Sequence, residues 1–209
     1  MDKIFEHLKH LYNEHGYRFY MIGSTSRDYL LNREITDYDF VTDALPEESL
    51  KFIKASSTFK KYGVLKTKID GKNIDIVTLR SEMNYEDSRH PSKIKFIKNI
   101  EEDFNRRDLT INAIYINELY QVENISLKGK EDLFNKKLVF IGDTLTRINE
   151  DPLRILRALR FAKEYGLSIN EKDLKILKEN MHLIEKLNPQ KVDEERRKMQ
   201  KIEELINEH

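Results

Sequence analysis

The sequence contains no cysteine, and this absence excludes whole classes of chemistry. The chain can form no disulfide and has no thiolate to act as nucleophile or metal ligand, which is typical of proteins of the reducing cytoplasm. Long apolar runs are missing too, since none approaches the roughly 20 residues that a helix needs to cross a bilayer. We therefore expect a cytoplasmic protein with no membrane partner.

Net charge is the third absence. Charged residues make up 35% of the chain, yet its 37 acidic and 37 basic residues cancel. A balanced chain is not a uniformly basic nucleic-acid-binding protein, although it can still carry a local basic surface. The length of 209 residues suffices for one domain or two small ones with a real hydrophobic core.

Hydrophobic periodicity predicts a mixed domain of helices and strands in the first two thirds of the chain. The expected elements are a helix that ends near Gly16, a strand over 17–23, a short helix over 24–31, a strand within 33–48, a helix over 45–56 and a hairpin over 64–80. The polar stretch 81–99 predicts an irregular loop that ends in a short strand. Three further strands are expected in AIYIN, YQVENIS and KLVFIG, between residues 113 and 142.

From about residue 143 onward every segment has a helical pattern. Segment 151–166 has proline at its first turn and glycine at its end, and two more helices are expected over about 171–187 and 190–207. The change predicts a boundary between a mixed domain over 1–142 and an all-helical domain over 143–209. The expected fold class is α+β, with a small mixed sheet.

Two aspartates interrupt the apolar strand DYDFVT, residues 37–42. Asp37 and Asp39 are two residues apart, so their side chains point to one face of the sheet, about 6.6 Å apart along the strand. At an effective dielectric near 20 two such charges repel by about 2.5 kcal/mol, which a divalent cation between them would offset. Asp75 lies in a second apolar strand. Taken singly, each aspartate also fits a turn, a cap or a solvated sheet face.

A turn suited to phosphate precedes this strand. In IGSTSRD, residues 22–28, a strand ends in Gly23-Ser24 and a helix begins, which offers backbone N–H groups and a hydroxyl at the positive end of the helix. Arg27, one turn into the helix, could add further donors. A plain strand–helix connection is the alternative interpretation of the same residues.

Together the two features suit two-metal nucleotidyl transfer. Asp37 and Asp39 would hold Mg²⁺, one metal activating an attacking hydroxyl and the other binding the triphosphate and the leaving pyrophosphate. Asp75 would hold the metal on the attacking side or orient the hydroxyl.

These segments resemble, in order and spacing, the class II tRNA nucleotidyltransferases (CCA-adding enzymes) and the related bacterial poly(A) polymerases of the polymerase β superfamily. The first motif of that family is matched by Gly23-Ser24, Arg27-Asp28, the strand 37–42 and Pro46-Glu47-Glu48. Asp75 stands where the family more often has glutamate. Three later segments resemble its second motif, a linking segment and its nucleobase-reading motif: RRDLTINA (106–113), GKEDLFNKKLVFIGD (129–143) and NEDPLRILRALRFAKEYG (149–166).

The resemblance implies a nucleotidyltransferase head over 1–142 and a nucleobase-reading neck over 143–209. It implies CCA addition or repair, in which C and A from CTP and ATP are joined to the 3′ end of tRNA and pyrophosphate is released. It assigns the ribose and phosphates of the nucleotide to residues that the spacing places on one turn of a helix: Arg107, Asp108 and Asn112. Taken alone, these residues also fit a helix with a solvated charged face.

The nucleobase-reading motif has a chemical rationale. Cytosine and adenine each present an amino donor beside a ring-nitrogen acceptor, and a carboxylate accepts hydrogen bonds where a guanidinium donates them. Asp151 and Arg154, one helical turn apart, can therefore pair with either base, whereas uracil and guanine would leave both contacts mismatched. Glu150 and Arg157 would orient this pair. The alternative is an acid–arginine pair at a helix start, worth only about 0.3–0.5 kcal/mol.

Several questions stay open at the level of sequence. The shared motifs do not separate CCA addition from poly(A) synthesis or from A-only or C-only addition, and a catalytically idle RNA- or nucleotide-binding module would keep them too. We expect the family's body and tail regions, which grip tRNA, to be absent from the chain. Residues 85–91 resemble the family's mobile loop, in which His90 is interpreted as an ordinary loop residue. The oligomeric state is not indicated.

Overall fold

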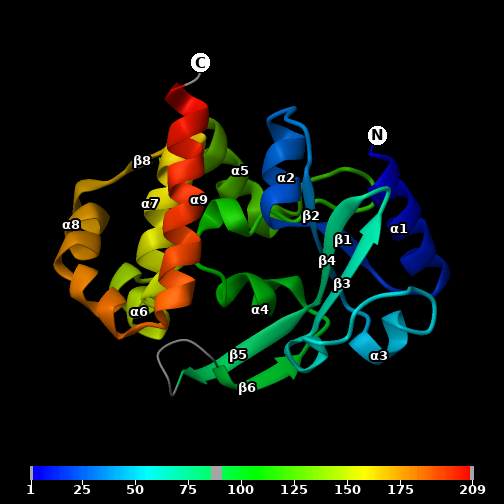
Figure 1. The fold of residues 1–209 in the computed structure, drawn as a ribbon. Coiled ribbons are helices and arrows are strands. Elements are labelled where there is room, and N and C mark those ends of the chain that lie inside the picture. The colour runs from blue at the N-terminus through cyan, green and yellow to red at the C-terminus, as the bar shows by residue number, and fades with distance from the viewer. Residues whose placement is uncertain (1, 86–90, 208–209) are drawn as a thin grey trace.

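The computed structural model describes residues 2–85 and 91–207, and for residues 83–85, 91–93 and 201–207 only the course of the backbone. His90 lies outside the described residues. Figure 1 shows a half that contains the sheet and the N-terminus beside a half made of helices that contains the C-terminus. The α+β fold class predicted from the sequence is confirmed.

The main sheet has four strands in the order β1-β2-β4-β3. β2 is parallel to β4, while β1 and β3 run antiparallel to their neighbours at the two edges. The strands are β1 (Phe19–Met21), β2 (Asp37–Thr42), β3 (Val64–Ile69) and β4 (Lys72–Thr78). The β3–β4 hairpin turns at Asp70 and Gly71, which have φ angles of 51° and 77°, so the predicted hairpin is confirmed.

A second hairpin lies where the sequence predicted a loop. β5 (Arg80–Tyr85) pairs with β6 (Pro91–Phe96) in an antiparallel ribbon that extends from the main sheet below α4 in the view of Figure 1. The loop prediction over 81–99 is therefore wrong, although its short final strand overlaps β6. A two-stranded ribbon outside the main sheet has little apolar surface to bury, so its sequence carries little of the period that identifies strands.

In the described chain, α-helices precede and separate the strands of the main sheet, and they make up most of the chain after residue 143. They are α1 (Lys3–Glu14), α2 (Gly23–Leu30), α3 (Pro46–Ser49), α4 (Ile100–Asn105), α5 (Leu127–Phe134), α6 (Thr144–Glu150), α7 (Leu153–Tyr165), α8 (Glu171–Glu179) and α9 (Pro189–Asn207). Within residues 2–85 and 91–207, no helix combines the length and the apolarity that a membrane crossing requires.

Three predicted elements differ from the structure. α3 ends at Ser49 rather than continuing to residue 56, because the chain there turns to pair Ser56 with Lys66 of β3. The helix predicted over 171–187 divides into α8 and a 3₁₀ helix over Met181–Lys186. Of the strands predicted between 113 and 142, only β7 (Lys137–Leu138) forms, paired in parallel with β8 (Ser168–Ile169), and the others are reduced to single bridges.

The largest apolar cluster connects the sheet with the helical half. It includes Phe5 of α1 and Phe40 of β2, and it continues through Ile155 and Phe161 of α7. A smaller cluster on the other side of the sheet contains Tyr20, Val41 and Tyr115, among others. The boundary predicted at residues 142–143 therefore falls inside a continuous core, and the division into two domains stays a prediction.

Candidate active site

The three predicted catalytic aspartates lie on one face of the main sheet. Asp39 of β2 is in register with Asp75 of β4, and Asp37 with Asn73, in the parallel pairing of the two strands. Residues in register on neighbouring strands point to the same face, about 4.8 Å apart. Asp37 is exposed and the other two aspartates are half-buried, whereas Tyr38 and Phe40, which alternate with Asp37 and Asp39 along β2, are buried in the core. The alternation that the sequence predicted is thus present.

The turn that begins α2 is built against Asp39. Oδ2 of Asp39 accepts hydrogen bonds from the Ser24 backbone N–H at 3.0 Å and from the Ser24 hydroxyl at 2.7 Å. The Asp39 backbone N–H in turn donates to the Thr25 hydroxyl at 2.6 Å. Gly23 has a φ of +59°, and a Cβ at this position would lie 2.7 Å from Asp39 Oδ2. Only glycine fits both the left-handed backbone and the close approach of the carboxylate.

Asp37 and Asp75, like Asp39, each have a polar partner on a neighbouring element. Asp37 accepts a hydrogen bond from the Asn73 side chain at 2.9 Å, and Asp75 forms an ion pair of 2.5 Å with Lys66 on β3. Among the described residues, no group of three or more Asp, Glu or His side chains is close enough to hold a metal ion. Carboxylate oxygens are nevertheless hard ligands, and Mg²⁺ is usually bound by one or two of them together with substrate phosphates and water. The Asp37–Asp39 pair fits that demand.

Arg27 points away from solvent into the interface between α2 and α7. Its side chain is buried, with the guanidinium carbon 4.7 Å from the Phe161 ring centre and 5.1 Å from that of Tyr165. It donates to the Asn112 side-chain oxygen and, at 3.3 Å, to the Ile111 carbonyl. Such a guanidinium stacked on two aromatic rings joins the turn at Gly23-Ser24 to the helix of the predicted nucleobase-reading motif.

Asp108 connects the second motif to the same helix. Its side chain accepts hydrogen bonds from Asn112 Nδ2 at 2.9 Å and from Arg157 Nε at 2.9 Å. Burial alone would raise the pKa of Asp108, but the charge of Arg157 and the hydrogen bond from Asn112 outweigh it and hold the pKa well below its usual range. Asp108 is therefore charged in the folded protein at neutral pH.

The second motif is not the helix that its spacing predicted. α4 ends at Asn105, Leu109 is extended, and residues Thr110–Asn112 form a short 3₁₀ helix. The Thr110 backbone N–H donates to the Val139 carbonyl at 3.0 Å, and Leu109 makes a bridge to Phe140. These pairings with a distant segment replace the backbone bonds of a continuous helix. Asp108 and Asn112 still meet through their side chains, as the spacing of the motif required.

The predicted nucleobase-reading residues surround the junction of α6 and α7. Asp151 lies between the two helices with an extended backbone. Its carboxylate accepts a hydrogen bond from the Leu153 backbone N–H at 3.0 Å. Arg154 lies in the first turn of α7 and pairs with Glu150 at 2.6 Å. Glu150 also pairs with Arg147 at 3.1 Å, so it is held between two guanidinium groups. The contact that was expected to orient Arg154 through Glu150 is present, whereas Arg157 contacts Asp108.

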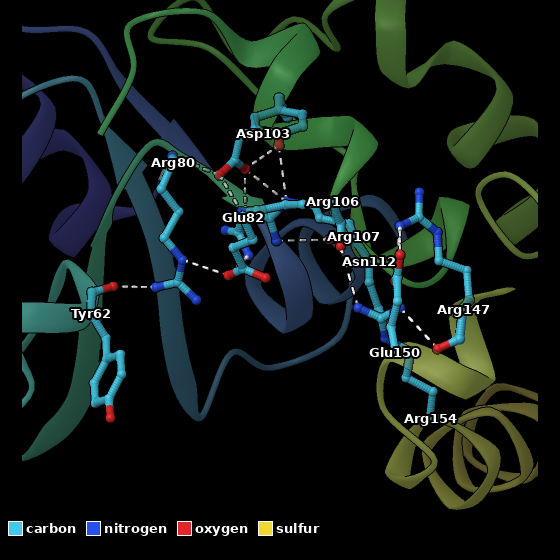
Figure 2. A network of polar contacts seen from close by, with 11 residues as sticks. Tyr62, Arg80, Glu82, Asp103, Arg106, Arg107, Asn112, Arg147, Glu150 and Arg154 are labelled. Carbon is cyan, nitrogen blue, oxygen red and sulfur yellow. Dashed lines mark hydrogen bonds and ion pairs between the residues drawn. The ribbon is translucent and has the colours of Figure 1, made fainter. Parts of the chain in front are cut away.

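Sequence reasoning missed one carboxylate at the site. Asp103, near the end of α4, is fully buried and forms ion pairs with Arg106 and Arg107, each at 2.8 Å. Figure 2 shows it at the centre of a polar network that reaches from Arg80 on β5 toward the α6–α7 junction. Its position three and four residues before two arginines was the available signal, because residues at that spacing meet on a helix.

Known proteins share this arrangement of segments. A family model described as the poly A polymerase head domain matches residues 19–139. The CCA-adding enzyme of Bacillus cytotoxicus is 36% identical over 187 residues, which are 89% of this chain and 47% of the relative. That of Bacillus pumilus is 35% identical over 207 residues, 97% of this chain and 50% of the relative. The chain belongs to the poly A polymerase head-domain family.

Solved structures agree on the fold. The CCA-adding enzyme of Bacillus stearothermophilus, crystallised with CTP, superposes with a TM-score of 0.83 at 28% identity, covering 95% of this chain and 49% of that one. A tRNA nucleotidyltransferase complexed with a primer tRNA and an incoming ATP analogue gives a TM-score of 0.71 at 26% identity, covering 96% and 60%. The chain thus spans about half the length of the curated relatives it matches. The resemblance found in the motifs is confirmed.

The structure sorts the predicted site residues of this family member into connected groups. Gly23 and Ser24 lie with the aspartates at the sheet, and Arg27 bonds to Asn112, which bonds to Asp108. Arg154 reaches the second motif through the backbone, since it donates to the Arg106 carbonyl at 3.5 Å. The roles of all these residues in binding and catalysis stay predictions.

Proposed function

We propose that this chain carries the nucleotidyl-transfer centre of a template-independent RNA nucleotidyltransferase. The reaction adds C and A from CTP and ATP to the 3′ end of tRNA, as CCA addition or repair requires. The RNA hydroxyl forms a bond to the α-phosphate, and the bond between the α- and β-phosphates breaks to release pyrophosphate. The observation that carries the proposal is the set of three aspartates on one face of the sheet beside the Gly23–Ser24 turn.

Asp37 and Asp39 are the residues that would hold the metal, and we propose Mg²⁺ because their oxygens match its preference. When bound, Mg²⁺ supplies Lewis-acid stabilisation of the triphosphate and a lower pKa for the attacking hydroxyl. Ser24 and the first backbone N–H groups of α2 would face the phosphates, as at other helix starts that bind anions. Asp75 would orient the hydroxyl or contribute to the metal site once its pairing with Lys66 is broken.

Selection of the nucleotide is proposed for the α6–α7 junction. Asp151 would accept from the amino group of cytosine or adenine, and Arg154 would donate to the ring nitrogen. The contact between Glu150 and Arg154 supports this role, because it restrains a flexible side chain in one direction. Arg107, Asp108 and Asn112 would act on the ribose and phosphates that CTP and ATP share.

The named relatives support the substrates of this proposal. One structural relative was crystallised with CTP and another with a primer tRNA and an ATP analogue. We propose in addition that residues 1–142 form the head and residues 143–209 the neck of the enzyme. A cytoplasmic location stays a prediction from the sequence.

Product analysis on a tRNA that lacks its CCA end tests the proposal. Each nucleoside triphosphate is supplied singly, and CTP and ATP are supplied together. Ordered addition of C, C and A that then stops is the expected result. A long A tail on tRNA and on unstructured RNA would move the function to poly(A) synthesis. Addition of one nucleotide type alone would mark a specialist enzyme, and no addition despite nucleotide binding would mark an idle module.

A further inference from the structure

Asp103, the acidic partner of Arg107, is fully buried. Its side chain has no exposed surface, and both oxygens are occupied. Oδ1 accepts from the Arg80 backbone N–H at 3.1 Å and from Arg106 Nε at 2.8 Å. Oδ2 accepts from Arg107 Nε at 2.9 Å and from the Tyr115 hydroxyl. Donors from four separate positions in the sequence therefore converge on one carboxylate.

This carboxylate separates two consecutive arginines. Two neighbouring guanidinium groups repel, yet each is drawn to a different oxygen of Asp103. Arg106 extends on toward Glu82 of β5, with which it pairs at 3.2 Å. Arg107 is turned the other way, toward the ring of Tyr115, whose centre is 5.3 Å from its guanidinium carbon. Figure 2 shows both arginines within the polar network around Asp103.

Tyr115 completes the support of Arg107. Its hydroxyl donates to Asp103 and accepts from Arg107 Nε at 2.9 Å, so it bridges the acid and the base. Within the described residues, the partners of Arg107 are Asp103, Tyr115 and, at 3.4 Å, the Asn112 carbonyl. They involve Nε and one N–H on each terminal nitrogen, and a guanidinium carries five N–H groups. Among the described residues no contact occupies the other two N–H groups of Arg107, and these are the donors that would face a ligand.

We propose that Asp103 and Tyr115 are positioning residues, which aim Arg107 at the ribose and triphosphate that CTP and ATP share. The inference rests on the proposed nucleotide-binding role of Arg107. A buried ion pair is by itself a weak source of stability, because the removal of both charges from water offsets their attraction. A carboxylate that is fully buried between two arginines is instead well suited to hold them in one direction.

The protonation states keep this arrangement constant near neutral pH. Burial alone would raise the pKa of Asp103, but Arg106 and Arg107 outweigh it and hold the pKa well below its usual range. Burial raises the pKa of Tyr115 well above its ordinary value. Near neutral pH, Asp103 thus remains a hydrogen-bond acceptor and Tyr115 a hydrogen-bond donor. The support of Arg107 is a fixed one.

The test is CTP and ATP binding to the purified chain in the presence of Mg²⁺, measured by titration calorimetry without RNA. Asp103→Asn should weaken the binding of CTP and of ATP by about tenfold or more, because it removes the charge that holds Arg107. The ratio of CTP to ATP affinity should stay within about twofold of wild type, since Arg107 acts on the shared part. A purely structural defect that reached the nucleobase-reading residues would change this ratio. The titration contains no RNA. If the chain failed to extend RNA, the proposed reaction would be contradicted, but the comparison of nucleotide affinities between wild type and Asp103→Asn would still test the positioning role.

Glu195→Gln is the matched control. Glu195 is also buried and is shared by Arg160 and Lys198, at 2.7 and 3.0 Å, between α7 and α9. This variant breaks a comparable buried pair and should bind both nucleotides within about twofold of wild type. Equal weakening in Glu195→Gln would overturn the proposal, and so would a folded Asp103→Asn that binds CTP and ATP like wild type.

A second variant decides the matter if Asp103→Asn does not fold. Tyr115→Phe keeps both ion pairs of Asp103 and removes only the hydroxyl that bridges to Arg107. It should weaken the binding of CTP and of ATP by the same factor, about threefold to tenfold, which is the usual effect of one lost hydrogen bond. Unchanged binding of both nucleotides in Tyr115→Phe would overturn the positioning role.

Discussion

Replacing Gly23 with alanine tests whether the turn at the start of α2 fixes the position of Asp39. Gly23 has a φ of +59°, and a Cβ there would lie 2.7 Å from Asp39 Oδ2 and 3.3 Å from Asp39 Cγ. The left-handed backbone alone costs an L-residue about 1–2 kcal/mol. The contact adds a second effect, because a methyl group cannot share that space with a carboxylate oxygen. The Asp39 side chain therefore has to move.

Gly166→Ala separates these two effects. Gly166 ends α7 with a φ of +61° and has nothing within 4 Å of a built Cβ, so it carries the backbone strain without the contact. We expect each variant to lose about 1–2 kcal/mol in the free energy of unfolding, measured by urea denaturation. Only Gly23→Ala should slow nucleotide addition to tRNA by about 100-fold, since a catalytic group displaced by about 1 Å has an effect of that size.

Two results would refute this reasoning. If Gly23→Ala folds and adds nucleotides at the wild-type rate, the position of Asp39 against the turn does not matter for catalysis. If Gly166→Ala loses as much activity as Gly23→Ala, backbone strain rather than the displaced carboxylate explains the loss.

Three further predictions concern arginine and aspartate side chains. Arg154→Gln should lower the ratio of CTP to UTP incorporation by about tenfold or more without changing Mg²⁺ binding, and an unchanged ratio would contradict the base-reading role. Arg27→Lys should lower the free energy of unfolding by about 1–2 kcal/mol, because lysine cannot both stack on two aromatic rings and donate to Asn112; denaturation at wild-type midpoint would contradict this. The pKa of Asp103 is lowered by folding, so its stabilisation is present above the unfolded pKa of about 3.9 and is lost as the pH falls below it. The difference in free energy of unfolding between wild type and Asp103→Asn should therefore narrow between about pH 7 and pH 3, and a constant difference would count against it.

Elements that depend on neighbouring residues could be predicted from the sequence. The alternation in DYDFVT is enough to place Asp37 and Asp39 on one face, and Asp70-Gly71 is enough for a tight hairpin turn. The helix α7 follows from apolar spacing and from the glycine that ends it in the left-handed conformation. In each case the deciding interactions lie within one segment, so local pattern and final structure agree.

Interactions between distant segments decided what the sequence could not predict. β5 carries little apolar pattern, and its Glu82 pairs instead with Arg106, 24 residues further along the chain. The helix predicted for the second motif gives way to pairing of Thr110 with Val139. The sequence around Arg27 predicts a side chain at the surface that donates hydrogen bonds. In the structure, α7 packs against it, and the rings of Phe161 and Tyr165 cover its guanidinium.

The most direct measurement is pyrophosphate release from CTP, with Mg²⁺ and a tRNA that lacks its CCA end, by wild type, Asp39→Ala and Asp43→Ala. Asp43 follows the same strand but pairs with Arg18 at 3.0 Å, so it serves as the matched acid. The proposed metal role predicts release by wild type and Asp43→Ala, and a loss of about a thousandfold in Asp39→Ala, equivalent to about 4 kcal/mol. Release at the wild-type rate by a folded Asp39→Ala would contradict the proposed centre.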